Sequence, residues 1–540
     1  MELALNYRFH EISNNPDRYR ESKWMAPRNK HVKGIRYYSF VGSNGYAIAG
    51  KGYIMSLVKA GIYVHLKPIK FFLETDSATL SEDDSVLAVC MNNDSITYDT
   101  VIIHSVPSFW NKIVSMERME NPNVKIYGLT VWETDRVHPP WLDLIVQNSV
   151  NGLLVPSDWN RQIFQKSVQD NRVKGFPPVY VCHHAITDPP SLKNGSRHSR
   201  EQLYGRAKIA FLCIGSWTAR KGIDETIEAY VKAFNKQTDV VLYLKTFFNV
   251  YSDENSQKLR KQLDDVLGKY SNPPRVVLNT QLISDDHIND LIVNCDVFLS
   301  LCNSEGVGLG ACQSALNGKI IVMTGYGGQR EYINHGYWID FKMGVVNVPP
   351  GFASWIQSPQ QWAYPDMEHA VSTLRHVYTN FESCAALSQK NRAHMLERFN
   401  HDEVARELQQ ALNGTQRSRP AVRVEKVAKP VPAPVPVQER KRSNGEEHRG
   451  SRESRQADRL GGGRRRRSPS EEGSRAPPAP TRRRSPAEGR RRSPAEGRRR
   501  SPTEGRRRSP AERERERERE TLRHLRLRLR CLTPRYPSCL

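Results

Sequence analysis

The stretch Asn303-Ser304-Glu305-Gly306-Val307-Gly308-Leu309-Gly310-Ala311-Cys312-Gln313 places an acidic residue directly before a glycine-rich turn. The sequence predicts a helix of small residues after this turn, then the apolar strand Gly318-Lys319-Ile320-Ile321-Val322 and a second glycine turn, Gly325-Tyr326-Gly327-Gly328. A turn with few side chains lets a ligand reach backbone N–H groups, and the helix start behind it favours a negative charge. The order therefore predicts a doubly wound α/β domain with a site for an anionic ligand.

Strand and helix patterns also alternate through the first 190 residues. An apolar run at 35–41 is followed by the turn 42–45, and residues 46–60 carry apolar positions at helical spacing. Residues 62–66 give the next strand, so this part predicts a βαβ unit with parallel strands. Further strands are predicted at 100–104, 125–131, 152–155 and 179–182.

A second α/β series follows the polar stretch 191–206, which has the composition of a linker. Its strands are predicted at 209–214, 240–245, 275–278, 297–301 and 319–323, with helices such as 224–234 and 287–293 between them. We therefore predict the fold class α/β, with two doubly wound Rossmann-like domains facing a cleft. The first covers residues 1–190, the second covers 205–366, and two closing helices cover 367–412. Ligands bind at the carboxyl ends of such strands.

The second series opens with a loop suited to a phosphate. Gly215-Ser216-Trp217-Thr218-Ala219-Arg220-Lys221-Gly222-Ile223-Asp224 lies between a predicted strand and a predicted helix. Backbone N–H groups and the cations of Arg220 and Lys221 would converge there on an anion. The alternative is a helix start with solvated charges.

These two segments together resemble the donor site of the family 4 (group 1) glycosyltransferases of GT-B fold. In that family a Ser-Glu-Gly-aromatic-Gly-Leu start is followed by a second Glu eight residues after the first. Glu305 matches the first Glu, whereas Gln313 replaces the second and Gly310 replaces the usual Pro. The loop is similar to the family's diphosphate loop: Lys221 matches its Lys, and Ser216 stands where many members have a cation.

The resemblance implies the role of each donor-site residue. Glu305 would hydrogen-bond the sugar hydroxyls and Gln313 the ribose; a neutral acceptor in place of a carboxylate would weaken donor binding about tenfold. Besides Glu305 and Gln313, the residues implied to bind the donor are Gly215, Ser216, Arg220, Lys221, Gly308 and Leu309. The alternatives are a helix-start acid at Glu305 and a partly exposed polar helix residue at Gln313.

The first domain offers weaker candidates. Gly42 and Gly45 resemble the family's first glycine loop, although any tight turn between a strand and a helix has this composition. Glu133, in Trp132-Glu133-Thr134-Asp135, could face the acceptor, as could Asp135; the alternative is a helix cap beside a packed Trp. His104 ends a predicted strand and could line the cleft or be structural. His184 falls where the chain crosses between the domains and is interpreted as a hinge residue.

The positive charge of the chain is concentrated in its last part. Residues 413–540 hold 38 Lys or Arg against 16 Asp or Glu, while the preceding residues hold 43 against 42. The last part contains Arg-Arg-Arg-Ser-Pro-Ala-Glu-Gly repeats, whose composition predicts a disordered Pro/Arg/Ser-rich tail. Such a tail could bind nucleic acid or another polyanion in a sequence-independent, salt-sensitive way, or it could be a low-complexity extension.

Other features bear on cofactor and location. No Asp-x-Asp occurs, which favours metal-free chemistry, and no cofactor is expected besides the nucleotide sugar as co-substrate. Nine scattered cysteines without a Cys-x-x-Cys spacing indicate free thiols in a reducing compartment. The absence of a signal peptide and of a long apolar run predicts a soluble cytoplasmic protein without a membrane span.

The sequence therefore predicts a glycosyltransferase that moves a sugar from a nucleotide-diphosphate sugar to a hydroxyl of a glycan, lipid or protein acceptor. Family resemblance implies retention of anomeric configuration and no metal. Two alternatives stay open: an Arg-rich nucleic-acid-binding protein with a degenerate transferase body, and a nucleotide-sugar hydrolase.

Overall fold

A computed structural model describes residues 23–27, 32–42, 44–69, 82–187, 198–248, 251–348 and 354–416. These residues belong to one compact unit, Met1–Gln438. The predicted linker is described only from residue 198 onward. The predicted tail, apart from its first four residues, lies outside the described residues.

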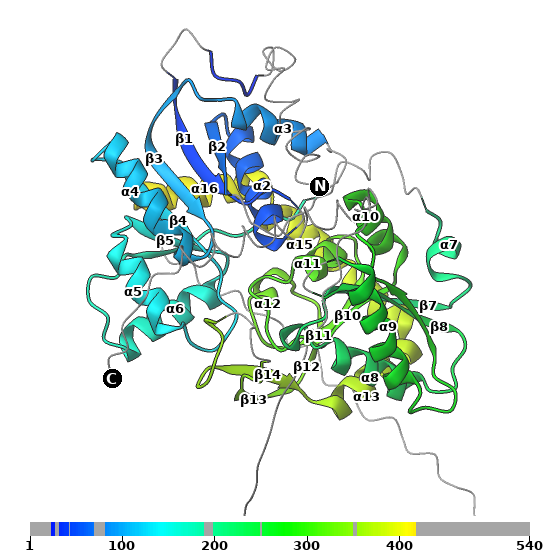
Figure 1. The fold of residues 1–540 in the computed structure, drawn as a ribbon. Coiled ribbons are helices and arrows are strands. Elements are labelled where there is room, and N and C mark those ends of the chain that lie inside the picture. Colours follow the sequence, from blue (N-terminus) through cyan, green and yellow to red (C-terminus); the bar gives the residue numbers. More distant parts are fainter. Residues whose placement is uncertain are drawn as a thin grey trace, which may run out of the picture. The chain divides into compact units, whose positions relative to one another are not determined.

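The first half of the chain forms a six-stranded parallel sheet in the order β2-β1-β3-β4-β5-β6 (Figure 1). Its strands are β1 (Val32–Ser39), β2 (Tyr63–Pro68), β3 (Ile96–His104), β4 (Lys125–Leu129), β5 (Gly152–Val155) and β6 (Val179–Val181). The connecting helices are α2 (Gly45–Lys59), α3 (Glu82–Met91), α4 (Trp110–Glu120), α5 (Pro139–Gln147) and α6 (Asp158–Asp170).

The first crossover begins and ends at side chains that the sequence supplies locally. The Asn44 side chain accepts a hydrogen bond from the Ala47 N–H at 3.0 Å and so caps α2. Gly61 follows the end of α2 at a φ of +78°, a left-handed conformation that favours glycine. The helix then lies over the sheet, and Tyr53 and Leu57 are fully buried in its core.

The second half forms another six-stranded parallel sheet, in the order β12-β11-β10-β7-β8-β9. Its strands are β7 (Ile209–Ser216), β8 (Val240–Phe247), β9 (Arg275–Asn279), β10 (Val297–Ser300), β11 (Ile320–Thr324) and β12 (Tyr337–Ile339). The helices are α7 (Arg200–Tyr204), α8 (Ile223–Phe234), α9 (Asp253–Leu267), α10 (Asp285–Asn294), α11 (Leu309–Leu316) and α12 (Gln329–Tyr332).

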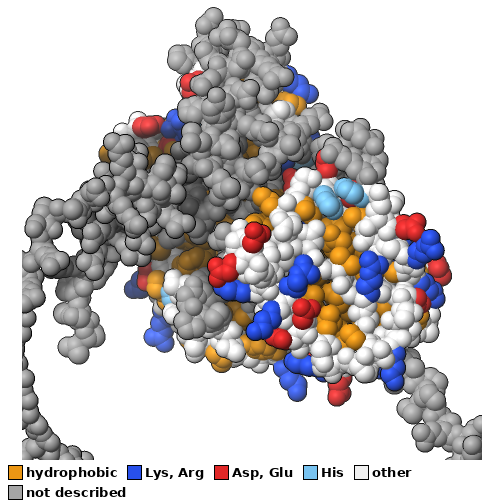
Figure 2. All heavy atoms as spheres, turned by 45° about the vertical axis from the view of Figure 1, so that its right-hand side comes forward, with side chains coloured by type: hydrophobic (Ala, Val, Ile, Leu, Met, Phe, Trp, Pro, Cys, Tyr) orange, Lys and Arg blue, Asp and Glu red, His pale blue; other side chains and the backbone are white. Residues whose placement is uncertain are grey.

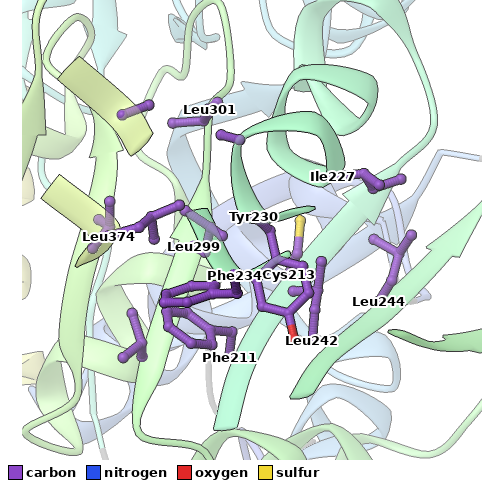
Figure 3. Packing of buried hydrophobic residues seen from close by; sticks show 14 of the residues in the cluster. Phe211, Cys213, Ile227, Tyr230, Phe234, Leu242, Leu244, Leu299, Leu301 and Leu374 are labelled. Atoms are coloured by element: carbon purple, nitrogen blue, oxygen red, sulfur yellow. The ribbon is translucent and has the colours of Figure 1, made fainter. Parts of the chain in front are cut away.

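Apolar side chains fill both faces of this second sheet. Figure 3 shows Phe211 of β7 beside Tyr230 and Phe234 of α8, with Leu242 and Leu299 from neighbouring strands. On the other face Leu212 and Phe298 pack among residues of α10 and α11. Strands buried on both faces are typical of doubly wound sheets, so the predicted fold class is confirmed.

The prediction of two closing helices over 367–412 is wrong: the structure has four. They are α13 (Met367–Thr379), α14 (Phe381–Ser388), α15 (Lys390–Arg398) and α16 (His401–Leu412), and a two-stranded sheet precedes them, β13 (Phe341–Val345) with β14 (Gln361–Pro365). Asn380 and Asn400 interrupt the helical pattern, and the Asn400 side chain caps α16 by accepting from the Glu403 N–H at 2.9 Å.

Helix α16 returns to the first half of the chain and lies beside α2 (Figure 1). The Tyr127 hydroxyl donates to the Leu412 carbonyl at 2.8 Å, and Val404 and Leu408 are buried in the core of the first sheet. The end of the described chain therefore stabilises the first sheet.

The surface shows the balanced charge that the sequence gives residues 1–412. Figure 2 shows Lys and Arg side chains interspersed with Asp and Glu on one face of the described part. The seven cysteines within the described ranges are all free and buried, as predicted; Cys531 and Cys539 lie outside them. A helix with the length and apolar character needed to cross a membrane is not found in the described part of the chain.

Candidate functional site

Two loops meet at the point where the order of the second sheet reverses. The loop after β7 and the loop after β10 lie side by side, because β7 and β10 are neighbours although three strands apart in sequence. The Asn303 N–H donates to the Arg220 carbonyl at 2.8 Å, and the Asn303 side chain donates to the Ala219 carbonyl at 2.8 Å. Such a reversal is where doubly wound sheets bind ligands.

Lys221, Arg220 and Glu305 form a charged cluster between these loops. The Lys221 ammonium pairs with one carboxylate oxygen of Glu305, and Arg220 Nη1 lies 3.2 Å from the other. Arg220 also donates to the Ser304 carbonyl at 2.8 Å. The aliphatic part of Lys221 lies over Gly215, where a side chain would be in contact with it. The structure thus brings together the three charged residues that the sequence singled out.

A fourth charged group reaches this cluster from the first half of the chain. Glu133, after β4, places a carboxylate oxygen 3.0 Å from Arg220 Nη1. The Trp362 indole N–H donates to the Glu133 carbonyl at 3.2 Å, so β14 fixes the segment from the other side. Glu133 therefore faces the predicted donor loop and joins the two halves of the chain.

Burial and neighbouring charges act differently on the two carboxylates. Burial raises the pKa of Glu133, and the attraction of Arg220 does not outweigh it. Burial acts in the same direction on Glu305, but Lys221 and Arg220 together outweigh it and lower the pKa of Glu305. Glu305 is thus held as a carboxylate by two cations, although it is only 7 % exposed.

Glycines allow the loops to approach this closely. Gly222 has a φ of +57°, and a side chain there would collide with the Leu301 carbonyl oxygen. Gly306 lies against Val131 of the first half, and Gly328 donates its N–H to the Glu305 carbonyl at 2.9 Å. These glycines therefore let the backbone come close to Glu305, beside the side chains of Lys221 and Arg220.

Helix α11 begins beside the cluster. Gly308 is its N-cap residue, with a φ of +71°, and no side chain caps the helix start, where Leu309 is the first helical residue. Gln313 lies one turn further, and its side-chain oxygen is buried without a hydrogen-bond partner. An uncapped helix start favours an anion, and an unpaired buried oxygen fits a ligand hydroxyl. Ser216 ends β7 at the same edge, half-buried.

The first-half candidates occupy the carboxyl edge of the first sheet. Gly42 lies in the turn between β1 and α2 with a φ of +139°, and Gly45 is the first residue of α2. His104, at the end of β3, is 2 % exposed, and its Nδ1 lies 3.1 Å from the Tyr37 hydroxyl. Its ring also packs against Tyr46 and Tyr53. His104 is thus enclosed by aromatic rings, and its role in lining a cleft stays a prediction.

The other residues of the Trp132–Asp135 segment have structural partners. Trp132 is buried against Trp141, and its indole N–H donates to Thr134 Oγ1 at 2.8 Å. Asp135 accepts a hydrogen bond from the Gln361 N–H of β14 at 2.6 Å. The alternative of a packed Trp therefore describes Trp132, whereas Asp135 ties the segment to the second half of the chain.

A buried histidine between two carboxylates was not predicted. His183 Nε2 lies 2.7 Å from Glu331 Oε1 of α12, and its Nδ1 lies 2.9 Å from Glu407 Oε2 of α16. Burial opposes the imidazolium, but Glu407 and Glu331 raise the pKa of His183 to about 10. The adjacent His184 donates its N–H to the Tyr332 hydroxyl at 2.8 Å. The segment Val181-Cys182-His183-His184, where the chain crosses between the two halves, was the one signal of this site in the sequence. The partners of His183, Glu331 and Glu407, lie far away in sequence.

Within the described ranges, no group of three or more His, Cys, Asp or Glu side chains could hold a metal ion. Chemistry without a metal or another cofactor stays a prediction.

The match to a family model concerns the second half of the chain. Residues 197–350 match the family model described as Glycosyl transferases group 1. No curated protein is found to match the sequence.

Three of the similar solved structures are bacterial. Anabaena Alr3699/HepE in complex with UDP-glucose is 14% identical and covers 71% of this chain and 100% of its own, with a TM-score of 0.46. The E. coli trehalose-6-phosphate protein bound with UDP-2-fluoro glucose is 12% identical (70% and 98% covered; TM-score 0.46). The Burkholderia xenovorans α,α-trehalose-phosphate synthase in complex with glucose-6-phosphate is 11% identical (59% and 74% covered; TM-score 0.44). The chain is thus similar over residues 197–350 to Glycosyl transferases group 1. Its two doubly wound sheets form a GT-B fold.

Proposed function

We propose that this chain is a family 4 glycosyltransferase that moves a sugar from a nucleotide-diphosphate sugar to an acceptor hydroxyl, with retention of configuration and without a metal. The observation that carries the proposal is the convergence of Lys221 and Arg220 on Glu305 beside the uncapped start of α11. Two cations and free helical N–H groups at one point suit a diphosphate.

In this proposal Glu305 and the cations exchange partners when the donor binds. Lys221 and Arg220 neutralise the diphosphate, and Glu305 then accepts hydrogen bonds from the sugar hydroxyls. Because the two cations lower the pKa of Glu305, it is a carboxylate at neutral pH and can accept those bonds. Gln313, whose side-chain oxygen is unpaired, accepts from the ribose.

The reaction breaks the bond between the sugar C1 and the phosphate oxygen and forms a bond from C1 to the acceptor oxygen on the same face. The acceptor proton passes to the departing phosphate oxygen, and the nucleoside diphosphate leaves. Lys221 and Arg220 stabilise the negative charge that develops on that oxygen. The chain otherwise contributes by holding the donor and acceptor in position.

The test uses the full chain with UDP-glucose, GDP-mannose and ADP-glucose as donor probes, and binding is measured by calorimetry. Lys221→Ala should weaken binding of the preferred donor by about 10- to 100-fold, the value of one hydrogen bond from a charged group. Lys232→Ala is the matched control, because Lys232 lies on the exposed side of α8 and pairs with Glu228. Equal, small effects of both substitutions would contradict the assignment of Lys221.

Product analysis then separates transfer from hydrolysis. Incubation with candidate glycan, lipid and peptide acceptors should give a glycosylated product whose anomeric configuration, read by NMR, matches that of the donor. Release of free sugar at the same rate with and without acceptor would instead indicate a hydrolase. An inverted product would overturn the retaining mechanism while leaving the transferase assignment in place.

A further inference from the structure

Lys245 is a buried lysine at the ligand-binding edge of the second sheet. It lies on β8, is 4 % exposed, and pairs in register with Ile214 of β7 and Asn279 of β9. Its ammonium makes no hydrogen bond or ion pair with any residue that the structure describes, and burial alone lowers the pKa of Lys245 to about 8. Burying a charge without a partner is unfavourable in free energy. Lys245 is therefore suited to bind an acceptor group that comes from outside the chain.

The neighbours of Lys245 include two aromatic rings and a histidine. Its Nζ lies 5.1 Å from the centroid of the Tyr251 ring and 6.0 Å from that of Phe247, and these two rings stack at 4.7 Å. His287, in the first turn of α10, has a buried Nε2 without a hydrogen-bond partner. Burial, then the charges of His198 and Lys245, lower the pKa of His287. Lys245 Nζ on β8 and His287 Nε2 on α10 thus both lack a hydrogen-bond partner, and they lie close enough for the charge of Lys245 to affect His287.

The position of Lys245 relative to the proposed donor site follows from the strand register. Alternate residues of a strand share one face, and Lys245 therefore shares the face of Tyr243, which packs in the same core cluster as residues of α10 and α11. Ile214, its register partner, precedes Gly215, and a side chain on Gly310 of α11 would lie 3.9 Å from Ile214 Cβ. The first turn of α11, Ile214 and Lys245 thus follow one another across that face.

Provided that the proposed function holds, this arrangement indicates how a bound donor is oriented along the edge of the sheet. The sugar end lies at Glu305 beyond β10, and the diphosphate lies at Lys221 and Arg220 after β7. The nucleoside then extends to the other side, past β7 towards β8 and α10. Its base would then be directed towards Lys245 and His287, where the stacked rings of Phe247 and Tyr251 lie beside Lys245.

The chemistry of an ammonium group restricts which base fits. An ammonium has three donors and no acceptor, and pyrimidines of the uracil type and guanine present a carbonyl oxygen where adenine presents an amino group. We propose that Lys245 binds a carbonyl oxygen of the donor's base and so selects uridine or guanosine diphosphate sugars against adenosine diphosphate sugars. This inference rests on the proposed function and adds the nucleotide class to it.

The experiment measures the affinity of the full chain for UDP, GDP, ADP and inorganic pyrophosphate by calorimetry. Wild type should bind UDP or GDP at least about tenfold more tightly than ADP, as expected for one hydrogen bond from a charged group. Lys245→Met keeps the aliphatic stem and removes the donors. It should reduce that ratio to below about threefold and leave the affinities for ADP and pyrophosphate nearly unchanged. The matched control is Lys258→Met on the exposed side of α9, where Lys258 pairs with Glu254.

A second variant keeps the test valid if Lys245→Met does not fold. Lys245→Gln offers both a donor and an acceptor, so it should bind ADP more tightly relative to UDP than wild type does. Unfolding midpoints of all variants show whether a lost preference comes from a lost fold.

The possible outcomes separate the two proposals. If neither nucleotide nor pyrophosphate binds wild type, the proposed function fails and this inference fails with it. If all three nucleotides bind equally well, or the preference survives in Lys245→Met, the transferase proposal stands and Lys245 is not a selector of the base. An equal loss for all probes, pyrophosphate included, would mean that Lys245 contacts phosphate, which also overturns the inference.

Discussion

The carboxyl edges of the two sheets share one architecture but differ in charge. At the edge of the second sheet Arg220, Lys221 and Glu305 lie within ion-pair distance, and Glu133 joins them from the first half. At the edge of the first sheet the buried groups around His104 are neutral. Burial lowers the pKa of His104 well below its usual range and raises the pKa of Tyr46 to about 12.

These neutral groups make most of their hydrogen bonds with one another. The Tyr46 hydroxyl lies 3.0 Å from Thr130 Oγ1, and His104 bonds to the Tyr37 hydroxyl. Ser39, at the end of β1, keeps a buried hydroxyl without a partner. A charged cluster suits a diphosphate and the neutral groups around His104 suit an uncharged hydroxyl, so the difference agrees with the proposed division between donor and acceptor.

The largest expected effect compares two glycines in left-handed conformation, one from each half. Gly222→Ala should destabilise the fold by about 2–5 kcal/mol, because the strained backbone costs about 1–2 and the collision with the Leu301 carbonyl adds about 1–3. Gly61→Ala carries only the first cost, since nothing lies within 4 Å of the added carbon. Urea unfolding of both variants measures the difference, and equal losses would refute the close approach at Gly222.

A smaller effect is expected from pH, through two adjacent histidines. The pKa of His183 is raised to about 10, mainly by Glu407 and Glu331 against the effect of burial. The folded state therefore holds this proton more tightly than the unfolded state does. The resulting stability is complete below about pH 6.5 and is lost as the pH rises towards 10, by an amount on the order of 2–4 kcal/mol.

His184 should act in the opposite direction. Burial, followed by the charge of His183, lowers the pKa of His184 to about 3, so the unfolded state gains the proton first. Stability is then lost as the pH falls below about 6.5. The free energy of unfolding between pH 4 and 10 checks both signs. His183→Gln should remove the loss of stability on the alkaline side. It should also reduce the loss on the acidic side, because the charge of His183 contributes to lowering the pKa of His184. An alkaline loss in this variant as large as in wild type would contradict the assignment to His183; Arg398 Nη1, 3.5 Å from Glu407, is then the alternative source.

The sequence predicts those features of the molecule that depend on residues close together in the chain. Buried parallel strands are recognised as short apolar runs. Lys221 and Glu305 are recognised because each lies in a glycine-rich loop formed by one continuous segment of the chain. The partners of Arg220 and His183 are not predictable in this way. Glu133, Glu331 and Glu407 reach them only through tertiary contacts.

Two further features have a signal in the sequence. Lys245 follows five apolar residues at 240–244, and a charge at that position of a strand buried on both faces is unusual. Asn380 and Asn400 break the pattern over 367–412, and Asn is a preferred N-cap residue. The carboxyl ends of nine of the eleven predicted strands differ from the predicted ends by one or two residues, and five of these nine strands are longer than predicted.

The smallest expected effect compares the two carboxylates of the charged cluster, one from each half of the chain. Two cations lower the pKa of Glu305, so its charge stabilises the fold, whereas burial raises the pKa of Glu133, so its charge does not. Glu305→Gln should therefore lower the free energy of unfolding by about 1–3 kcal/mol at pH 7, and Glu133→Gln should change it by less than about 1 kcal/mol in either direction. Each variant is the control for the other, because both keep the shape of the side chain beside Arg220. Unfolding in urea at pH 7 measures the two changes, and a larger loss in Glu133→Gln would show that the ion pair between the two halves, rather than the pair within the second half, holds the cluster together.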